Sequence, residues 1–331
     1  GNSIASGGNY NVVVGDEAGT ALTTGDANVA VGYGALDLED TGTNSVAIGY
    51  NALTTQNNDA ANYNVAVGYA AGTAITTGIQ NTLIGGLSGD AITDADVNVA
   101  IGYNALTANQ LGSKSVAIGG HALYAQNPAT ATAMYNTAVG NDAGLLVTTG
   151  IQNTLIGALA GDALTDADYN IAIGASALGA DTLGSMSVAI GHAALQAQNF
   201  TTATNAYNVA VGKDAGTAVT TGVQNVLVGG LAGDALTDAD YNVALGHGAL
   251  STDTLGSRST ALGYYSLFTQ NLTTATDVYN TAVGFAAGQL VTTGVRNTII
   301  GGLAGDALTD ADDNVAIGAY ALSADTLGSR S

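Results

Sequence analysis

Residues 64–68 of this chain read Asn-Val-Ala-Val-Gly, and this five-residue phrase occurs, with small variations, eighteen times. Its first position is Asn or Ser, its second is Val, Thr or Ile, its third is usually Ala, its fourth is Val, Ile or Leu, and its fifth is Gly. Most successive glycines are 17 residues apart, and the step is 19 before Gly68 and 21 before Gly140, Gly212 and Gly284. Such self-similarity is the signature of a repeat architecture, in which one short unit is stacked many times.

A longer period groups these coils in fours. Gly68, Gly140, Gly212 and Gly284 are each 72 residues apart, so one superrepeat holds four coils. The chain is therefore predicted to be a single continuous β-solenoid shaft over residues 1–331, with about eighteen coils of about 17–18 residues. The superrepeats are expected at about 8–60, 61–132, 133–204, 205–276 and 277–331.

Both ends of the sequence continue the pattern. Ser3, in the stretch Asn-Ser-Ile-Ala at residues 2–5, looks like the opening of an earlier coil, and Ser331 stands where another coil would open. Stacked repeats need terminal repeats with a polar outer face, and none is visible in the sequence. The segment is thus expected to be a fragment of a longer fibre.

Each phrase is predicted to form a short β-strand. The β-branched residues at its second position and the Val, Ile or Leu at its fourth favour a pleated surface. The 47 glycines in 331 residues disfavour helix. A second, looser strand is expected at residues 103–106, Tyr-Asn-Ala-Leu, and at the equivalent places in other coils. Two short strands and two turns per coil predict an all-β fold, a repetitive parallel β-solenoid of the β-roll type.

The two faces of the predicted strand differ in character. Because side chains alternate along a strand, the Asn and Ala of each phrase share one face and the second and fourth residues share the other. The small Ala suits a narrow interior, and the Asn side chains are expected to form a ladder that bonds one amide to the next. The opposite face would present a continuous apolar stripe to water, which soluble monomers avoid. Self-association is therefore expected to cover it.

The composition excludes several classes of partner. The chain has five Lys and Arg against 26 Asp and Glu, which gives a net charge of -21. Nucleic acids and anionic membranes are bound by clusters of basic residues, so neither is expected as a partner. No apolar run approaches the roughly 18 residues of a membrane span, so membrane insertion is not expected. The absence of Cys excludes disulfides and thiolate metal sites.

The phrase resembles the repeats of two kinds of fibrous surface protein. Ser-Val-Ala-Ile-Gly at residues 45–49, 115–119 and 187–191 is similar to the head repeats of trimeric autotransporter adhesins of the YadA type. Asn-Thr-Ala-Val-Gly at residues 136–140 and 280–284, with Thr-Thr-Gly between coils, resembles the repeats of phage tail-fibre proteins more closely still. The resemblance implies a left-handed parallel β-roll wound as an intimate homotrimer. The coil here is longer than that of the adhesin heads.

These observations together predict a structural, non-enzymatic protein. The expected function is the extracellular shaft of a homotrimeric phage tail fibre, whose tip for a host glycan or other receptor lies outside this segment. A bacterial surface adhesin or extracellular filament of the trimeric autotransporter type is the alternative, and a monomeric calcium-binding or ice-binding solenoid is a third reading. No nucleophile elbow, phosphate-binding loop or Cys and His constellation in the sequence indicates catalysis.

One motif has the composition of a metal site. Gly-Asp-Ala-(Leu/Ile)-Thr-Asp-Ala-Asp occurs four times, and its last two carboxylates and a following Asn give the alternating oxygens of calcium loops. The EF-hand pattern is incomplete, since its central Gly and closing Glu are absent. A hydrated acidic turn that keeps a filament soluble would have the same composition. The candidate calcium ligands are Asp94, Asp96, Asp166, Asp168, Asp238, Asp240, Asp310 and Asp312.

The histidines and tyrosines also keep fixed places in the coil. His121, His192 and His247 follow a motif Gly, where other coils carry Tyr, and no His or carboxylate pairing accompanies them in the sequence. They are expected at the surface or at an interface. The fifteen tyrosines stand chiefly before the motif Asn or after the motif Gly. They are expected to pack against the turns of the next coil, with a glycan-stacking stripe as the alternative.

Overall fold

The computed structural model describes residues 8–331, which form strands, turns and bends and contain no helix. This part of the chain consequently offers no helical segment able to cross a bilayer. The described residues form two compact units, 8–167 and 168–331, and each is a parallel β-solenoid. The predicted all-β solenoid with a repeat of about 17 residues is therefore confirmed. That both units form a single shaft stays a prediction, and the coil suggested at Ser3 lies outside the described residues.

Each described coil carries one three-residue strand, which covers the second to fourth positions of the phrase. In the first unit these strands are β1 (Val12–Val14), β2 (Val29–Val31), β3 (Val46–Ile48), β4 (Val65–Val67), β5 (Thr82–Ile84), β6 (Val99–Ile101), β8 (Val116–Ile118), β10 (Thr137–Val139) and β11 (Thr154–Ile156). In the second unit they are β12 (Ile171–Ile173), β14 (Val188–Ile190), β16 (Val209–Val211), β17 (Val226–Val228), β18 (Val243–Leu245), β20 (Thr260–Leu262), β22 (Thr281–Val283), β23 (Thr298–Ile300) and β24 (Val315–Ile317).

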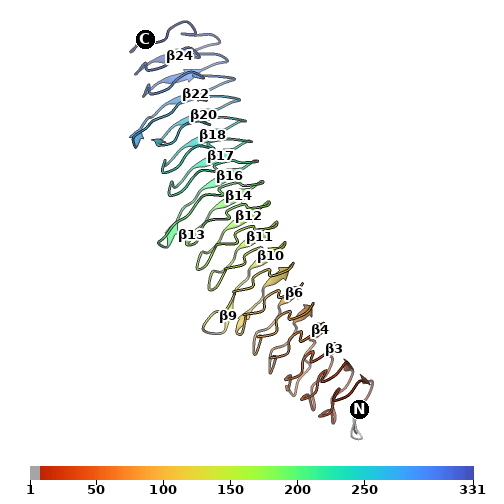
Figure 1. The fold of residues 1–331 in the computed structure, drawn as a ribbon. Coiled ribbons are helices and arrows are strands. Elements are labelled where there is room, and N and C mark those ends of the chain that lie inside the picture. The colour runs from red at the N-terminus through yellow and green to blue at the C-terminus, as the bar shows by residue number, and fades with distance from the viewer. Residues whose placement is uncertain (1–7) are drawn as a thin grey trace. The chain divides into compact units, whose positions relative to one another are not determined.

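Within each unit, neighbouring strands pair in parallel and without a shift of register. Ala66 of β4 lies beside Leu83 of β5, and Ala100 of β6 lies beside Ala117 of β8. Because every pair keeps this register, residues at one position of the phrase form a column along the unit. Figure 1 shows the strands of each unit following one another along the same side of the coils.

The second strand predicted at residues 103–106 is wrong. These residues form a turn, because Asn104 and Leu106 have φ angles of 56° and 57°, in the left-handed region that an extended strand excludes. Additional pairing comes instead from the longer coils that precede the Tyr-Asn phrases. There, two-residue strands pair in parallel: β7 (Gly112–Ser113) pairs with β9 (Thr132–Ala133), β13 (Gly184–Ser185) with β15 (Thr204–Asn205), and β19 (Gly256–Ser257) with β21 (Thr276–Asp277).

The motif Gly is required by both its backbone angle and its surroundings. The eighteen motif glycines have φ angles from 120° to 147°, which residues with a side chain rarely adopt. A Cβ added to Gly119 would stand 2.3 Å from the carbonyl oxygen of Gly140 in the next coil. The coils therefore approach each other too closely at this corner for any side chain.

The narrow interior is filled by residues of complementary size. The strand residue Ala100 is fully buried, and the turn of its coil supplies the buried Leu106. Where the strand carries Leu83 instead, the turns beside it carry glycine: a Cβ on Gly72 or Gly89 would stand 2.7 or 2.8 Å from a Leu83 methyl carbon. Leu or Ile stands at the third position of four phrases, at Leu83, Leu155, Leu227 and Ile299. At Leu83 the larger side chain thus occupies space that two turn glycines leave open.

The first-position Asn side chains join successive coils. Asn64 accepts a hydrogen bond of 2.9 Å at Oδ1 from the backbone N–H of Asn81 and donates one of 2.8 Å from Nδ2 to the carbonyl of Gly78. Asn81 Nδ2 also lies 3.3 Å from Asn64 Oδ1, so the predicted amide-to-amide ladder is present, with shorter bonds to the backbone. Ser331 occupies the same column, since its N–H donates to Asn314 Oδ1 at 2.9 Å.

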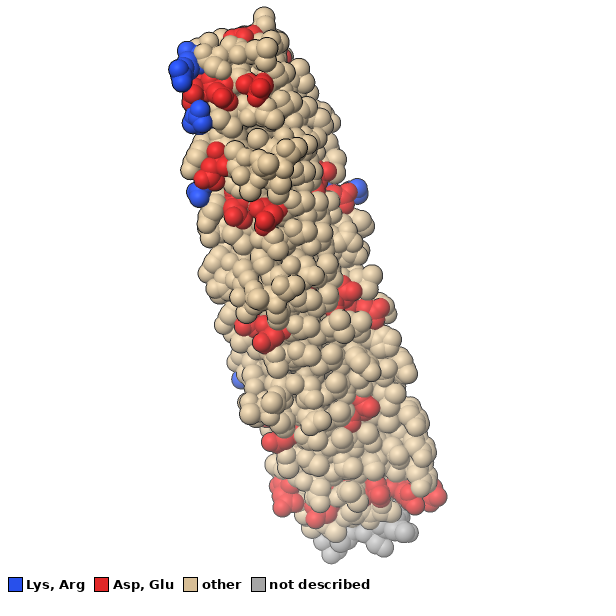
Figure 2. Space-filling model, turned by 60° about the vertical axis from the view of Figure 1, so that its left-hand side comes forward, with Lys and Arg blue, Asp and Glu red and all other residues tan. Residues whose placement is uncertain are grey.

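The second and fourth positions of the phrase point outward. They are half-buried or exposed in every described strand, as at Ile84 and Ile300, each 38% exposed. No charged residue stands at these positions in any of the eighteen phrases. Each unit thus carries an uncovered apolar stripe along its sheet, which we call the outer stripe. In Figure 2, the acidic residues on the face in view lie in small separate groups with uncharged surface between them.

Candidate functional site

The candidate calcium ligands hydrogen-bond to neighbouring coils. Asp94 accepts a bond of 2.5 Å from Thr77 Oγ1, and Asp96 accepts one of 2.8 Å from the backbone N–H of Ile79. The threonine contact recurs at Asp166, Asp238 and Asp310, the backbone contact recurs at Asp240 and Asp312, and the N–H of Asp168 donates to Ser185. Within residues 8–331, no three His, Asp or Glu side chains come together as a metal site. Calcium at these positions stays a prediction.

Chelation tests this calcium prediction directly. Calcium bound at the Asp pairs should raise the melting temperature, and excess EGTA should lower it again, because a ligand of the folded state stabilises that state. Replacing both Asp94 and Asp96 by Asn should reduce the shift, since the charged oxygens are lost. Asp59→Asn, at an exposed carboxylate outside the motif, is the matched control. A melting temperature indifferent to calcium and to EGTA would refute calcium binding.

A buried polar cluster joins the third and fourth coils of a superrepeat. The buried Asp181 accepts bonds from the N–H of Gly184 at 3.0 Å and from Nε2 of Gln198 at 2.5 Å. Gln198 Nε2 also donates to Ser187 Oγ at 3.1 Å, and its Oε1 accepts a bond of 2.9 Å from Asn208. Ser at the opening of the fourth coil is thus explained, because its hydroxyl bonds to the Gln of the same coil, accepting at Ser187 and donating at Ser115.

The equivalent cluster of one superrepeat departs from this pattern. Asp253 accepts a bond of 2.5 Å from Gln270, as Asp181 does from its Gln. Asn109 stands at the equivalent position of an earlier superrepeat, and there the Nε2 of the buried Gln126 has no hydrogen-bond partner among the described residues. An unpaired buried donor costs about 1–3 kcal/mol. The carboxylate is therefore the residue type that satisfies the Gln.

Asp181→Asn should lower the free energy of unfolding by about 1–3 kcal/mol, because the amide leaves Gln198 as poorly paired as Gln126 is. Urea unfolding followed by circular dichroism measures this loss. Asp325→Asn is the matched control, because Asp325 accepts the same turn bond from the N–H of Gly328, at 2.9 Å, and has no hydrogen bond to a Gln among the described residues. Equal losses in both variants would assign the effect to the turn bond and contradict a role for Gln198.

Glu39 is the corresponding carboxylate of the first superrepeat. It accepts bonds from the N–H of Gly42 at 2.7 Å, from Gln56 Nε2 at 2.9 Å and from Asn62 Nδ2 at 3.1 Å. Burial raises the pKa of this carboxyl above its usual value, and the bonds from Gln56 and Gly42 oppose the rise. Because these donors belong to the solenoid itself, the buried carboxylates are part of its internal structure.

Exposed aromatic rings form short stacks at the position after the motif Gly. The ring centroids of Tyr33 and Tyr50 are 5.2 Å apart, and those of Tyr50 and Tyr69 are 5.4 Å apart. A second stack consists of His247, Tyr264 and Phe285. These rings pack on the equivalent ring of the next coil, whereas the tyrosines before the motif Asn, such as Tyr63, extend into solvent. Both sets leave aromatic surface accessible.

The expectation that the histidines lack a carboxylate partner is wrong for two of them. Nδ1 of His121 lies 3.0 Å from Asp142, and Nδ1 of His192 lies 3.5 Å from Asp214. Each partner stands one long coil later, so the sequence separation hides a contact between neighbouring coils. Lys213 lies 2.5 Å from Asp214, and its hydrogen bond, together with that of His192, lowers the pKa of this carboxyl below its usual value.

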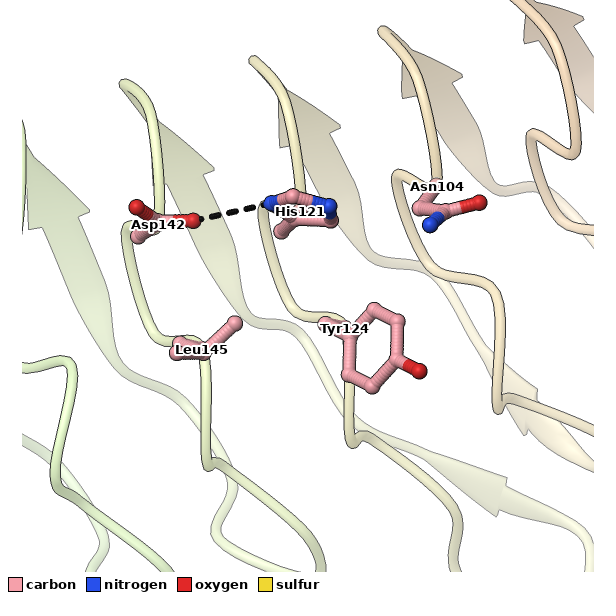
Figure 3. A pocket seen from close by; sticks show the side chains of 5 residues that line it. All are labelled: Asn104, His121, Tyr124, Asp142 and Leu145. Atoms are coloured by element: carbon pink, nitrogen blue, oxygen red, sulfur yellow. Dashed lines mark hydrogen bonds and ion pairs between the residues drawn. The ribbon is translucent and has the colours of Figure 1, made fainter.

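The pair of His121 and Asp142 belongs to an open pocket of about 420 Å³ (Figure 3). The other lining residues are Asn104, Tyr124 and Leu145, which come from three successive coils of the first unit. The imidazole contacts the Tyr124 ring edge-on, with centroids 5.8 Å apart. An aromatic ring beside amide, imidazole and carboxylate groups suits non-covalent binding of a polar ligand that has one apolar face.

No protein-family model matches the chain, and neither do curated proteins or solved structures.

Proposed function

We propose that this chain is the structural shaft of a homotrimeric extracellular fibre, and specifically of a phage tail fibre that presents a receptor-binding tip for host attachment. The single observation that carries the proposal is the outer stripe. Its uncharged, largely apolar side chains stay half-buried or exposed in every described strand. Apolar surface of this extent marks a protein interface rather than a free surface.

Further copies of the same chain are the partner that fits the outer stripe. The stripe repeats its apolar residues once per strand, at the spacing of about 4.8 Å between neighbouring strands. A second copy of the chain has apolar residues at this same spacing, so contacts made by one coil are repeated by every other coil. Permanent interfaces of homo-oligomers are large and apolar, as the outer stripe is. The number three follows from the resemblance to trimeric fibre repeats.

A second candidate is a bacterial surface adhesin or filament of the trimeric autotransporter type. It is favoured by the exposed tyrosines before the motif Asn, of which Tyr63, Tyr135 and Tyr207 are at least half exposed. Aromatic side chains that stand in solvent at regular intervals suit contacts to glycans or to an extended partner. Both candidates share the homotrimeric shaft and differ in whether its side binds ligands.

A charge placed in the outer stripe tests the shaft proposal. Ile156→Asp replaces a residue that is 37% exposed in the single chain, so the folded chain tolerates the change. In the oligomer the same carboxylate would be buried without a partner, which is strongly unfavourable. We therefore expect the variant to sediment as a monomer with an unchanged circular dichroism spectrum, at concentrations where the unaltered protein is a trimer.

Tyr135→Asp is the matched control, because Tyr135 is 51% exposed and lies outside the stripe. This variant should remain a trimer. If Ile156→Asp sedimented as the unaltered protein does, or if both variants dissociated, the outer stripe would not be the interface and the shaft proposal would fail.

A further inference from the structure

The pocket at His121 departs from the internal repeat. The residues 72 positions after its five lining residues are Ser176, Ala193, Gln196, Asp214 and Thr217. Those 144 positions after them are Gly248, Tyr265, Phe268, Ala286 and Gln289. Positions needed only for folding are alike in every superrepeat, as the motif Gly and the first-position Asn are. The combination of Asn, His, Tyr, Asp and Leu is thus not required by the fold.

The polar groups of this pocket are held in a fixed arrangement. Asp142 bonds to Nδ1 of His121 at 3.0 Å and accepts a bond of 2.5 Å from the side chain of Asn141. The imidazole also contacts Tyr103 and Tyr124, with ring centroids 5.8 Å away in both cases. The ring orientation is therefore set by three neighbours. This leaves Nε2 of His121 as the nitrogen that can bond to a ligand.

The apolar part of the pocket lies beside these polar groups. Figure 3 shows the face of the Tyr124 ring turned toward the viewer with Leu145 beside it, and it shows Asn104 on the opposite side of His121 from Asp142. Tyr124 is 40% exposed, and the side chain of His121 is 39% exposed. An aromatic face, an aliphatic side chain and a polar border therefore meet in one accessible hollow.

We propose that this pocket binds a neutral hexopyranose unit of a glycan. A galactose-type ring carries several C–H bonds on one face, which would pack on the Tyr124 ring, and hydroxyl groups on its edge. Those hydroxyls can donate to Asp142 and can accept from the amide of Asn104 and from Nε2 of His121 when it is protonated there. A neutral sugar is favoured over an anionic one because Asp142 and the net charge of -21 repel anions.

Titration with methyl β-galactopyranoside tests this site, with saturation-transfer NMR on the whole chain as the readout. We expect saturable binding with a dissociation constant on the order of millimolar, as suits a shallow hollow. Tyr124→Ala should weaken binding by about tenfold or more, because the stacking surface is lost. Tyr124→Phe should bind within about twofold of the unaltered protein, since it retains the ring.

Two comparisons keep the result specific. Tyr135→Ala removes an exposed ring outside the pocket and should leave the dissociation constant unchanged. Methyl β-glucuronide, which is anionic, should bind several-fold more weakly than the galactoside, and Asp142→Asn should narrow that difference. Absence of saturable binding would overturn the proposal. So would a Tyr124→Ala variant that is folded, as its melting temperature shows, and that binds the galactoside as tightly as the unaltered protein does. The shaft function does not depend on this outcome.

Discussion

Gly119→Ala should lower the free energy of unfolding by about 3 kcal/mol or more. The left-handed backbone angle of 135° at Gly119 costs a residue with a side chain about 1–3 kcal/mol. The added Cβ would also stand 2.3 Å from the carbonyl oxygen of Gly140, which is backbone and cannot move without separating the coils. Urea unfolding monitored by circular dichroism gives the difference between the variant and the unaltered protein.

Gly86→Ala is the matched control. Gly86 directly follows a motif Gly, and a Cβ there would meet only Tyr103, at an ordinary contact distance of 3.7 Å. This variant should unfold within about 0.5 kcal/mol of the unaltered protein. A Gly119→Ala variant as stable as Gly86→Ala would contradict the close stacking of coils at the motif Gly.

Ala117→Leu should also be strongly destabilising, by about 3 kcal/mol or by failure to fold. Ala117 is fully buried. The buried Leu123 already occupies the interior of its own coil, and the buried Leu106 occupies that of the preceding coil. Three additional carbon atoms have no free space there, so neighbouring coils must separate or side chains must leave their rotamers. Thermal and urea unfolding measure the loss.

Two comparisons make the Ala117 result decisive. Ala131→Leu places the same side chain at an exposed loop position and should be nearly neutral. Leu155 stands at the position of the strand that Ala117 occupies in its own coil. It fits because Gly144 and Gly161 flank it: a Cβ built on either glycine would stand 2.7 Å from a Leu155 methyl carbon. A neutral Ala117→Leu variant would show that the interior is not filled in the way the size pattern requires.

Much of the coil could be predicted from the phrase alone. The alternation of small and β-branched residues specified the three-residue strand and its buried Ala, since side-chain direction follows directly from the period of two. The second strand was not predicted correctly, because Leu106 adopts a left-handed φ angle that its residue type does not indicate. Leu rarely takes such angles, and here its burial at the turn stabilises them.

The candidate sites were less accessible to sequence reasoning. His121 and Asp142 are separated by the long coil, so their contact could be found only by aligning equivalent positions of successive coils. When the coils are aligned on the Gly that ends each phrase, His121 and Asp142 both lie two positions after a motif Gly. The Ser that opens the fourth coil was visible in the sequence, but the structural reason for it became clear only from the position of Gln198 inside the coil.

The mass of the segment in solution tests the central claim, that copies of the chain cover the outer stripe. Light scattering after size exclusion measures it without a shape assumption. Three times the chain mass of 32.4 kDa is the predicted result, and it should persist on dilution because the proposed interface is large and apolar. A mass of one chain at every concentration would leave the stripe exposed to water and would contradict the fibre account.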